Sequence, residues 1–483
     1  MYLEPSMFLP ILPEILLLVL GAVVLILDLI LPKEQHRNLG WVTAMGMGLI
    51  MLASVVSRPT AESVQVWGGM IRHDWLAYAF KLLFLFGAAV TALFAMDFKN
   101  LGHRGEFYVL MIASTIGMTF MASSADLVML YLAIETTSIP LYILAGFFIH
   151  DDKSTEAGFK YLLFGAMASA VMLYGFSLLY GFAGTTNIYA IAEGVRLGGL
   201  PVATLVGSLM LVLVGFGFKI SAVPLHFWAP DVYEGAPTPV TGFLSTASKA
   251  AGFAVLVRFM LAVFPAIAPH WGAVLAALSV ATMTLGNLLA LSQKNLKRML
   301  AYSSIAHAGY ALIGVVAISD LGMTSVVLYL IVYLVTNLAA FGIVAAFGRV
   351  SNSDDMTAYY GLSRRSPWLA LAMLVALLSL AGMPPLGGFV GKVFVFAAAV
   401  KSNLIWLAVI GVLNSIIGLY YYLTVLKYVY LYRMPDENED EMPIPISLPY
   451  KVALIMLTVG IILIGTMFSP WYNWAAQAAA AIF

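Results

Sequence analysis

Long apolar stretches separated by short polar connections run through the whole chain of 483 residues. A transmembrane helix needs about 20 mostly apolar residues to cross a bilayer. On that scale the sequence predicts an all-α, polytopic membrane protein of about fourteen transmembrane helices. We expect these spans near residues 7–31, 40–56, 75–98, 106–122, 126–149, 158–183, 201–230, 238–264, 271–292, 298–318, 323–348, 367–400, 404–431 and 450–476.

The composition agrees with residence in lipid. Hydrophobic residues make up 62% of the chain and charged residues 10%, whereas about a quarter of the residues in a soluble domain are charged. Acids and bases balance at 24 each, so a nucleic-acid partner is not expected. The chain has no cysteine, which excludes disulfides and iron–sulfur ligation within it.

Basic residues in the predicted connections are concentrated on one side. Fifteen of them fall in odd-numbered connections: Lys33, Arg37, Lys99, Arg104, Lys153, Lys160, Lys294, Lys297, Arg298, Arg349, Arg364, Arg365, Lys427, Arg433 and Lys451. The even-numbered connections hold only four: Arg58, Arg72, Arg196 and Lys401. Cytoplasmic loops carry an excess of Lys and Arg. We therefore expect both termini on the non-cytoplasmic side, in a bacterial inner membrane.

Two spans are too long and too interrupted to be single helices. The seventh contains Pro224 shortly after Lys219, and the twelfth contains the sequence GMPPLGG shortly before Lys392. Proline removes a backbone donor, and the freed carbonyls must meet protein or water inside the membrane. The sequence therefore predicts broken helices 7 and 12, each beside a lysine and a hydrated cavity.

Spans 7 and 12 are five apart and so cross the membrane in opposite directions. That pattern is typical of inverted repeats, which pair two half-channels near the midplane. We divide the chain into an N-terminal three-helix segment (1–100), a first antiporter-like repeat of helices 4–8 (101–265), and a second, inverted repeat of helices 9–13 (266–431). An acidic loop and a peripheral C-terminal helix follow (432–483).

A few charges lie near the bilayer centre, where each costs several kcal/mol on insertion scales. Glu135 lies in the middle of the fifth span and Lys219 beside the first break. At ~4 Å and an effective dielectric of about 20, such a pair attracts by roughly 4 kcal/mol. Moving the two groups apart would switch Lys219 between holding and releasing a proton.

Further polar groups extend this predicted pathway. Lys249 lies between small residues in the eighth span and is expected to relay a proton from Lys219, and Lys392 is the corresponding group of the second half. His226 and His307 are additional candidates, since imidazole can pass protons along a water chain. Structural roles are expected at Arg258 and Lys81, which snorkel or pack, at Asp126, an N-cap, and at Glu14 and Asp28.

No energy source is evident in this chain. The sequence lacks G-x-G-x-x-G and G-x-x-x-x-G-K-[ST] motifs, and no His, Asp or Glu residues have metal-ligand spacing. A proton pump built on these residues would therefore be driven from another subunit.

Four stretches carry a family resemblance: LAIETTSIPLYILAGF, FGFKISAVPLHFWAPDVYEGAPTPVTGFLSTASKAAGF, SQKNLKRMLAYSSIAHAGY and SLAGMPPLGGFVGKVFVF. They resemble the antiporter-like membrane subunits of respiratory complex I, the NADH-quinone oxidoreductase, and most of all its subunit N, also called subunit 2. The likeness extends over roughly residues 100–430.

The resemblance implies a membrane-arm subunit with one proton channel of two half-channels. It places the family's helix 5 glutamate at Glu135, its lysines of helices 7 and 8 at Lys219 and Lys249, and its helix 12 lysine at Lys392. It implies no cofactor here, with NADH, FMN, iron–sulfur clusters and quinone handled by partner subunits. It also implies neighbouring membrane-arm subunits, one M-like and others small and K-, J- or A-like.

Several alternatives stay open at this point. Subunit M has a glutamate where this chain has Lys392, and subunit L is longer, so N is favoured. A plastid or cyanobacterial counterpart would take electrons from ferredoxin. The main rival function is a subunit of a multi-subunit sodium/proton antiporter, although no second acid accompanies Glu135 at the membrane centre. A purely structural scaffold would leave three midplane lysines unexplained.

Overall fold

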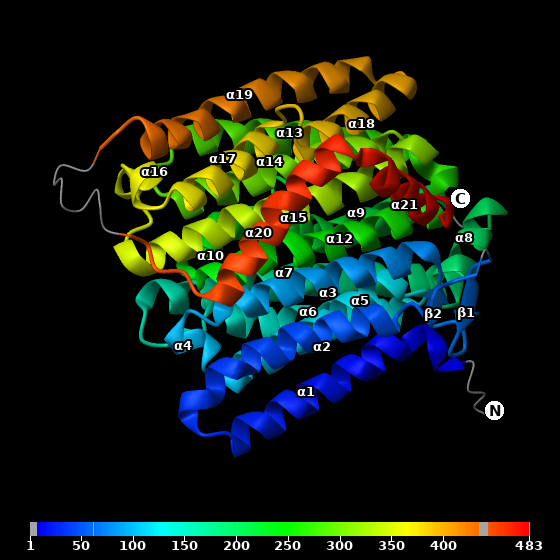
Figure 1. Cartoon of the computed structure of the whole chain (residues 1–483). Coiled ribbons are helices and arrows are strands. Elements are labelled where there is room, and N and C mark those ends of the chain that lie inside the picture. The colour runs from blue at the N-terminus through cyan, green and yellow to red at the C-terminus, as the bar shows by residue number, and fades with distance from the viewer. Residues whose placement is uncertain (1–6, 61, 200, 434–442, 483) are drawn as a thin grey trace.

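A bundle of long helices makes up almost the whole molecule (Figure 1). The computed structural model describes residues 7–60, 62–199, 201–433 and 443–482. Among these, twelve helices are long and apolar enough to cross a membrane. The 15-residue helix α2 (Leu39–Ala53) and the interrupted pair α17 (Pro367–Ala381) and α18 (Gly387–Lys401) supply two further crossings. The chain is therefore an all-α polytopic membrane protein.

The remaining crossings follow the predicted spans closely. They are α1 (Leu12–Ile30), α3 (Trp75–Ala95), α5 (Gly105–Ser123), α6 (Leu127–Ala145), α7 (Asp152–Ala183), α9 (Val202–Ile220) with α10 (Trp228–Gly235), α11 (Thr238–Phe243) with α12 (Lys249–Val257), α13 (Ala268–Leu291), α14 (Leu296–Val316), α15 (Asp320–Ser351), α19 (Ile405–Tyr430) and α20 (Leu448–Thr466). Two π-helical segments, Leu244–Ser248 and Arg258–Val263, flank α12.

Odd-numbered connections meet on one face of the bundle. A cavity of about 650 Å³ is lined by residues from the third, fifth, seventh, ninth and eleventh connections or the helix ends beside them, represented by Asp97, Asp151, Gly235, Lys297 and Asp354. A miscounted helix would have placed some of these on the opposite side. We call this side the cation-rich face, after its excess of Lys and Arg.

Even-numbered connections meet on the opposite face. A short hairpin in the second connection, β1 (Val64–Val66) and β2 (Ile71–His73), pairs through Ile71 with Ser124 of the fourth connection. Asp126 pairs in turn with Asn187, at the start of the amphipathic helix α8 (Ile188–Arg196) in the sixth connection. Asp126 also caps α6 by accepting two backbone N–H bonds, as expected. The hairpin and α8 were not predicted.

The two interrupted crossings therefore run in opposite directions. The seventh begins at Pro201 on the opposite face and ends at Gly235 on the cation-rich face. The twelfth begins at Pro367 on the cation-rich face and ends at Lys401 on the opposite face. The antiparallel relation expected for an inverted pair is thus present in the fold.

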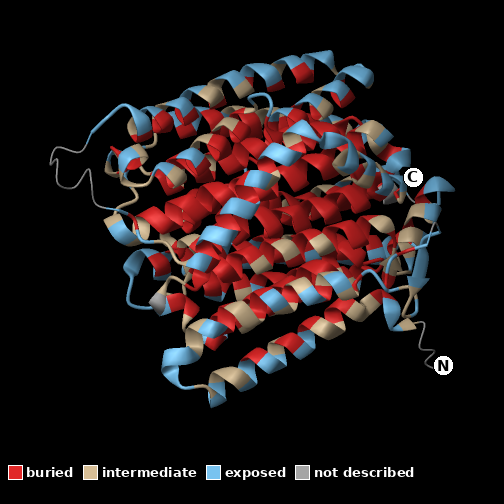
Figure 2. Cartoon of the chain, viewed as in Figure 1, coloured by how far each residue is buried: buried red, intermediate tan, exposed pale blue. Residues whose placement is uncertain are grey.

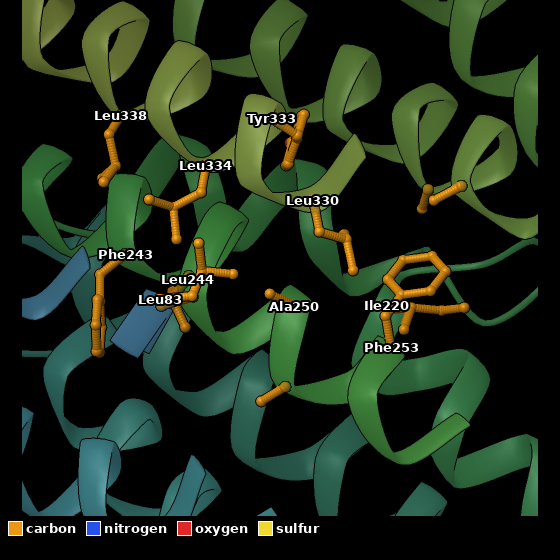
Figure 3. Packing of buried hydrophobic residues seen from close by; sticks show 14 of the residues in the cluster. Leu83, Ile220, Phe243, Leu244, Ala250, Phe253, Leu330, Tyr333, Leu334 and Leu338 are labelled. Atoms are coloured by element: carbon orange, nitrogen blue, oxygen red, sulfur yellow. The ribbon is translucent and has the colours of Figure 1, made fainter. Parts of the chain in front are cut away.

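Helix α15 lies at the centre of the bundle, where burial is most complete (Figure 2). Every described residue from 322 to 347 is buried. Leu330, Leu334 and Leu338 project from one side of α15 toward the eighth crossing, which contributes Leu244 and Ala250 (Figure 3). Close packing of this kind replaces lipid around the helix with protein.

The last predicted span differs from the observed structure. A single helix over 450–476 was expected, but α20 ends at Thr466 and a separate helix, α21 (Phe468–Ala480), follows after Met467. Met467 leaves the helical conformation at φ −121° and ψ 58°. Both helices pack against α15 and α3 (Figure 1). Most of the acidic loop, residues 434–442, lies outside the described residues.

Candidate functional site

Both helix breaks have the same backbone geometry. Ser221 after α9 and Gly382 after α17 have left-handed φ values of 60° and 86°. Each donates its N–H to the carbonyl three residues earlier, and the next residue donates to the carbonyl five residues earlier, which is a Schellman ending. Pro224 and Pro385 each follow three residues later. Gly382 indicates the second helix ending in the sequence, whereas Ser221 gives no such indication of the first.

The exposed carbonyls of the two breaks have different partners. Lys392 Nζ donates to Leu380 O and Ala381 O, both at 2.9 Å, and so caps the end of α17. At the first break the indole of Trp228 donates to Phe218 O at 3.2 Å. A cation is favourable at a helix C-terminus because the macrodipole is negative there. Lys392 is thus held by the break itself.

Glu135 and Lys219 lie at one cavity without touching. Lys219 Nζ donates to Ser138 Oγ at 2.9 Å, and Glu135 accepts from Ser169 Oγ. All four side chains line a cavity of about 10 Å³, which is room for about one water molecule. The direct ion pair expected between Glu135 and Lys219 is not formed in this conformation, because each group is hydrogen-bonded to its own serine.

The eighth crossing brings α12 close to the Lys219 side chain. A Cβ on Gly252 would lie 3.0 Å from Lys219 Cγ, so glycine permits this close approach of α12 to α9. The π-helical segment of small residues before Lys249 ends at Ser248. Lys249 itself is 2% exposed, and its ammonium donates to Ser304 Oγ at 2.5 Å and to Ser304 O at 2.8 Å.

A row of polar side chains on α15 continues from this point. Tyr333 donates to Ser304 Oγ at 2.7 Å, and Asn337 donates to Tyr333 at 3.0 Å and to Ser245 at 2.9 Å. One turn earlier, the Tyr329 hydroxyl lies 2.6 Å from His307 Nδ1. Residues four apart lie on one helix face, so this face of α15 connects Lys249 with the second half of the chain.

His307 on α14 contacts side chains of α15 and α19. Its Nε2 is 3.2 Å from the hydroxyl of Tyr422, which also bonds Ser303. A cavity of about 10 Å³ joins His307 and Tyr333 to Leu380, whose carbonyl accepts from Lys392. His307, expected as a candidate relay, is therefore placed between Lys249 and Lys392.

Several buried polar atoms near the first break have no protein partner in the described residues. They are His226 Nδ1, Ser221 Oγ, Tyr233 OH and, on α15, Asn337 Oδ1. An unsatisfied buried polar group is costly, and water is the usual partner for such groups. His226, the other candidate histidine, thus lies at a position suited to water, although no contact joins it to Lys219.

Sequence reasoning missed the residues that connect the candidates. Ser138, Ser169, Ser304, Tyr329, Tyr333 and Asn337 contact the predicted charged groups or link them. The only signal available was the spacing of Tyr329, Tyr333 and Asn337 at four-residue intervals within an apolar helix. Such spacing indicates a shared face but not the chemistry of its neighbours.

Two other membrane charges form closed ion pairs. Lys81 is 2.8 Å from Glu14 Oε1 and also donates to Pro10 O. Arg258 binds both oxygens of Asp74, at 2.7 and 2.8 Å. Snorkelling, expected for Lys81, is wrong, and of the two alternatives expected for Arg258 the structure shows packing rather than snorkelling, because both side chains are buried and paired within the protein. The structural roles expected for them agree with these pairs.

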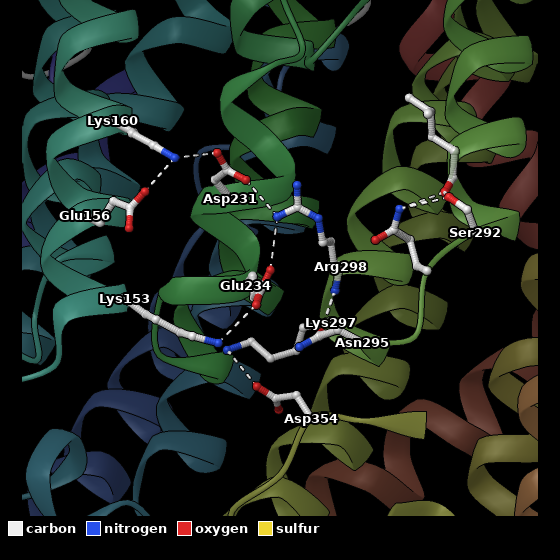
Figure 4. Close-up of polar contacts among 12 residues, drawn as sticks. Lys153, Glu156, Lys160, Asp231, Glu234, Ser292, Asn295, Lys297, Arg298 and Asp354 are labelled. Carbon is white, nitrogen blue, oxygen red and sulfur yellow. Dashed lines mark hydrogen bonds and ion pairs between the residues drawn. The ribbon is translucent and has the colours of Figure 1, made fainter. Parts of the chain in front are cut away.

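A network of charges connects three helices on the cation-rich face (Figure 4). Arg298 donates to Asp231 at 2.7 Å and to Glu234 at 3.0 Å, while Lys160 and Lys153 bind the same two carboxylates. Burial raises the pKa of both carboxyls, but these hydrogen bonds outweigh it, so each pKa lies below its usual range. The network ties α10, the end of the broken seventh crossing, to α7 and α14.

Arg298→Gln is expected to destabilise the chain more at neutral pH than in acid. A carboxyl with a lowered folded-state pKa contributes stability above its unfolded pKa and loses it as pH falls through the folded value. Since the network is half-exposed, we expect a loss of about 1 kcal/mol. Thermal unfolding of the solubilised protein at pH 7 and pH 3.5 would measure the difference.

The expected result is a variant difference at pH 7 that shrinks in acid. Arg196→Gln, which breaks a fully exposed pair with Glu193 on the opposite face, serves as the control and should change nothing measurable. An equal loss at both pH values would contradict the ionic role of the network.

Comparisons with known proteins agree with this architecture. Residues 124–418 match the family described as NADH:quinone oxidoreductase/Mrp antiporter, TM. NADH-quinone oxidoreductase subunit N of Moorella thermoacetica is 44% identical over 472 residues, covering 97% of this chain and 98% of that one. NAD(P)H-quinone oxidoreductase subunit 2 of Trichormus variabilis is 39% identical over 482 residues, covering 97% and 92%.

Solved structures give the same result. A chain of respiratory complex I from Thermus thermophilus with bound aureothin matches with a TM-score of 0.82 and 33% identity, covering 96% of this chain and 99% of that one. A chain of the Mrp complex from Dietzia matches at 0.86 with 20% identity, covering 99% and 98%, and shares the fold alone. This chain therefore belongs to the antiporter-like membrane subunits of NADH-quinone oxidoreductases, in the subunit N family.

Proposed function

We propose that this chain translocates protons as a membrane-arm subunit of a redox-driven NADH-quinone oxidoreductase. The observation that supports this most is the series of titratable and hydroxyl groups from Glu135 to Lys392, whose three lysines are buried. A buried lysine is rare in a membrane helix and is costly unless it has a task. Three of them, placed along one series of contacts and small cavities, have spacing suited to stepwise proton transfer.

Each group has a defined part in the proposed pathway. In the conformation described, Glu135 and Lys219 line one cavity but are each hydrogen-bonded to a serine rather than to each other. Further separation of the carboxylate from the ammonium would favour release of a proton. Approach of the carboxylate would restore the affinity of Lys219 for a proton. Pairing and separation therefore load and unload this site.

Onward transfer runs through the eighth crossing and α15. Lys249 receives a proton from the side of Lys219 and passes it to the hydroxyl groups of Ser304 and Tyr333. Hydroxyl groups both donate and accept, so they can carry a proton without becoming permanently charged. His307 and the small cavity beside it then connect this chain to Lys392.

Sidedness and neighbours are part of the proposal. By the positive-inside rule the cation-rich face lies in the cytoplasm of a bacterial cell, and both termini lie across the inner membrane. Glu135 is half-exposed on the side of the bundle, where a carboxylate in lipid would be costly. A neighbouring membrane-arm subunit that covers Glu135 would remove that cost. Flavin, iron–sulfur clusters and quinone would be held elsewhere in the assembly.

Lys219→Ala and Glu135→Ala are expected to lower proton pumping and coupled quinone reduction while the complex still assembles. Every 1.4 kcal/mol added to a barrier slows a step about tenfold, so Lys219→Ala should reduce pumping at least about tenfold. Dye quenching in membrane vesicles measures pumping, and native gels measure assembly.

Glu156→Ala is the matched control, because Glu156 is an exposed carboxylate on α7, beside α6. It should pump normally. Wild-type pumping in Lys219→Ala and Glu135→Ala would overturn the pathway. Flavin and iron–sulfur absorbance in the purified assembly would separate the oxidoreductase from a sodium/proton antiporter, whose assembly would show neither.

A further inference from the structure

A second cavity opens on the cation-rich face, away from the pathway described above. It has a volume of about 450 Å³ and lies between the ninth and eleventh connections and helix α19. Lys294 and Asp355 line its outer part, and Tyr421 and Thr424 of α19 line the wall. Because α19 packs directly on α13 (Figure 1), the wall of this cavity is also the end of the α13–α19 contact.

Four buried side chains lie directly below this cavity. Tyr421 donates to Asn287 Oδ1 at 3.0 Å, and Asn287 Nδ2 lies 3.0 Å from the Tyr310 hydroxyl and 3.3 Å from Asn414 Oδ1. All four residues are 4% exposed or less. We call them the Asn287 cluster. It comes from three helices, α13, α14 and α19, and is bonded into one unit through a single amide.

Lys392 lies at the inner side of the same cluster. Its ammonium is 5.0 Å from the centre of the Tyr310 ring and donates to Ser415 Oγ at 2.7 Å. Ser415 directly follows Asn414 in α19. Along α19, Asn414 and Tyr421 are seven residues, or about 10 Å, apart. The cluster thus occupies the short distance between the cavity and Lys392.

We propose that the Asn287 cluster is a closed gate on a second access route, from the cation-rich face to Lys392. This inference rests on the proposed role of Lys392 as a proton-carrying group. A carboxamide does not pass protons on by itself, so the bonded cluster blocks the route rather than conducting along it. A lysine open to both sides at once would leak, and pumps avoid this by alternating access.

The chemistry of the cluster suits a gate that opens. Asn287 Nδ2 has two hydrogens but three acceptors within reach, since Met283 O lies 2.9 Å away. The amide can therefore exchange one partner for another at little cost. Separation of α19 from α13 would break the bonds to Tyr421 and Asn414 together, and water from the cavity could then reach Ser415 and Lys392.

Thiol labelling tests this gate directly, because the chain contains no native cysteine. Ser415→Cys places a thiol beside Lys392, and Thr424→Cys places one on the cavity wall. The assembled complex, in vesicles with the cytoplasmic side outward, is treated with a charged, membrane-impermeant methanethiosulfonate. Thr424→Cys should react fast and Ser415→Cys slowly.

Opening the gate should change the labelling rate of Ser415→Cys but not that of Thr424→Cys. Asn287→Ala, combined with Ser415→Cys, should raise the labelling rate about tenfold or more, the factor expected from the loss of one or two buried hydrogen bonds. Tyr421→Phe removes a single oxygen and should act in the same direction, which keeps the test available if the alanine variant assembles poorly. Ser279→Ala, a buried polar change on the same helix outside the cluster, is the control.

Unchanged labelling in Asn287→Ala and Tyr421→Phe would overturn the gate, as would labelling of Ser415→Cys only from the other side. Neither result depends on pumping. Normal pumping in Lys392→Ala would instead overturn the proposed function, so the two failures are distinguishable.

Discussion

Replacement of Lys249 by alanine is expected to stop proton translocation through this subunit. In the proposed pathway the ammonium of Lys249 carries the proton between Lys219 and Ser304. Without it, Ser304 would receive no proton from the side of Lys219. Moving charge through the membrane interior without a carrier costs several kcal/mol. Since 1.4 kcal/mol corresponds to about a factor of ten, we expect a loss of about 100-fold or more, measured as proton uptake by vesicles.

Lys249→Arg separates a titrating role from a structural one. Arginine keeps the positive charge and can still donate to Ser304, but it does not deprotonate in proteins. We therefore expect Lys249→Arg to fail as Lys249→Ala does. Lys81→Arg is the matched control, because Lys81 is equally buried but pairs with Glu14, and it should pump normally. Normal pumping in Lys249→Arg would show that only the charge is needed.

The second large effect is expected from Asp74→Ala, which removes the partner of Arg258. Both side chains are almost fully buried, and Arg258 would keep a charge with only Tyr189 and Ala122 O as acceptors. Breaking a buried ion pair costs about 3–5 kcal/mol, which is a large part of a typical folding free energy of about 5–15 kcal/mol. The chain should largely fail to appear in the assembled complex on native gels.

Two companion variants make this result specific. Asp74 is the N-cap of α3, and Asp126→Ala removes another N-cap aspartate on the same face. Asp126 accepts only backbone N–H groups, so we expect a loss of about 1 kcal/mol. Arg258→Met combined with Asp74→Ala should recover part of the stability, because the buried charge of Arg258 is removed together with its partner. Equal melting temperatures for Asp74→Ala and the wild type would contradict a stabilising role of the pair.

The positions of the helices could be predicted from sequence because hydrophobic length decides them. Apolar stretches define the crossings, and the charges between them define the faces. The breaks were predictable from Pro224 and from Gly382 with the two prolines after it. The break at Met467 was missed although Gly465 and Pro470 flank it, because the apolar stretch over 450–476 has the length of one ordinary crossing.

The site was predictable in its charges but not in its connections. Charged groups in an apolar span are conspicuous, so Glu135, Lys219, Lys249 and Lys392 could be found directly. Serine and tyrosine are common in membrane helices, and whether Ser304 contacts Lys249 depends on how α14 lies against α12, which no local pattern encodes. The separation of Glu135 from Lys219 likewise follows from Ser138 and Ser169, two ordinary hydroxyl residues.

The complete burial of α15 has a consequence for how this protein is made. Helices enter the bilayer one after another, yet α15 in the finished bundle is surrounded by crossings that precede it and by α17, α18, α20 and α21, which follow it. The side of α15 that packs on α17, α18, α20 and α21 must therefore face lipid or loosely placed neighbours until those helices arrive, whereas Tyr329, Tyr333 and Asn337 contact segments that are made before α15. Final packing around α15 therefore has to wait until the last helices have been synthesised.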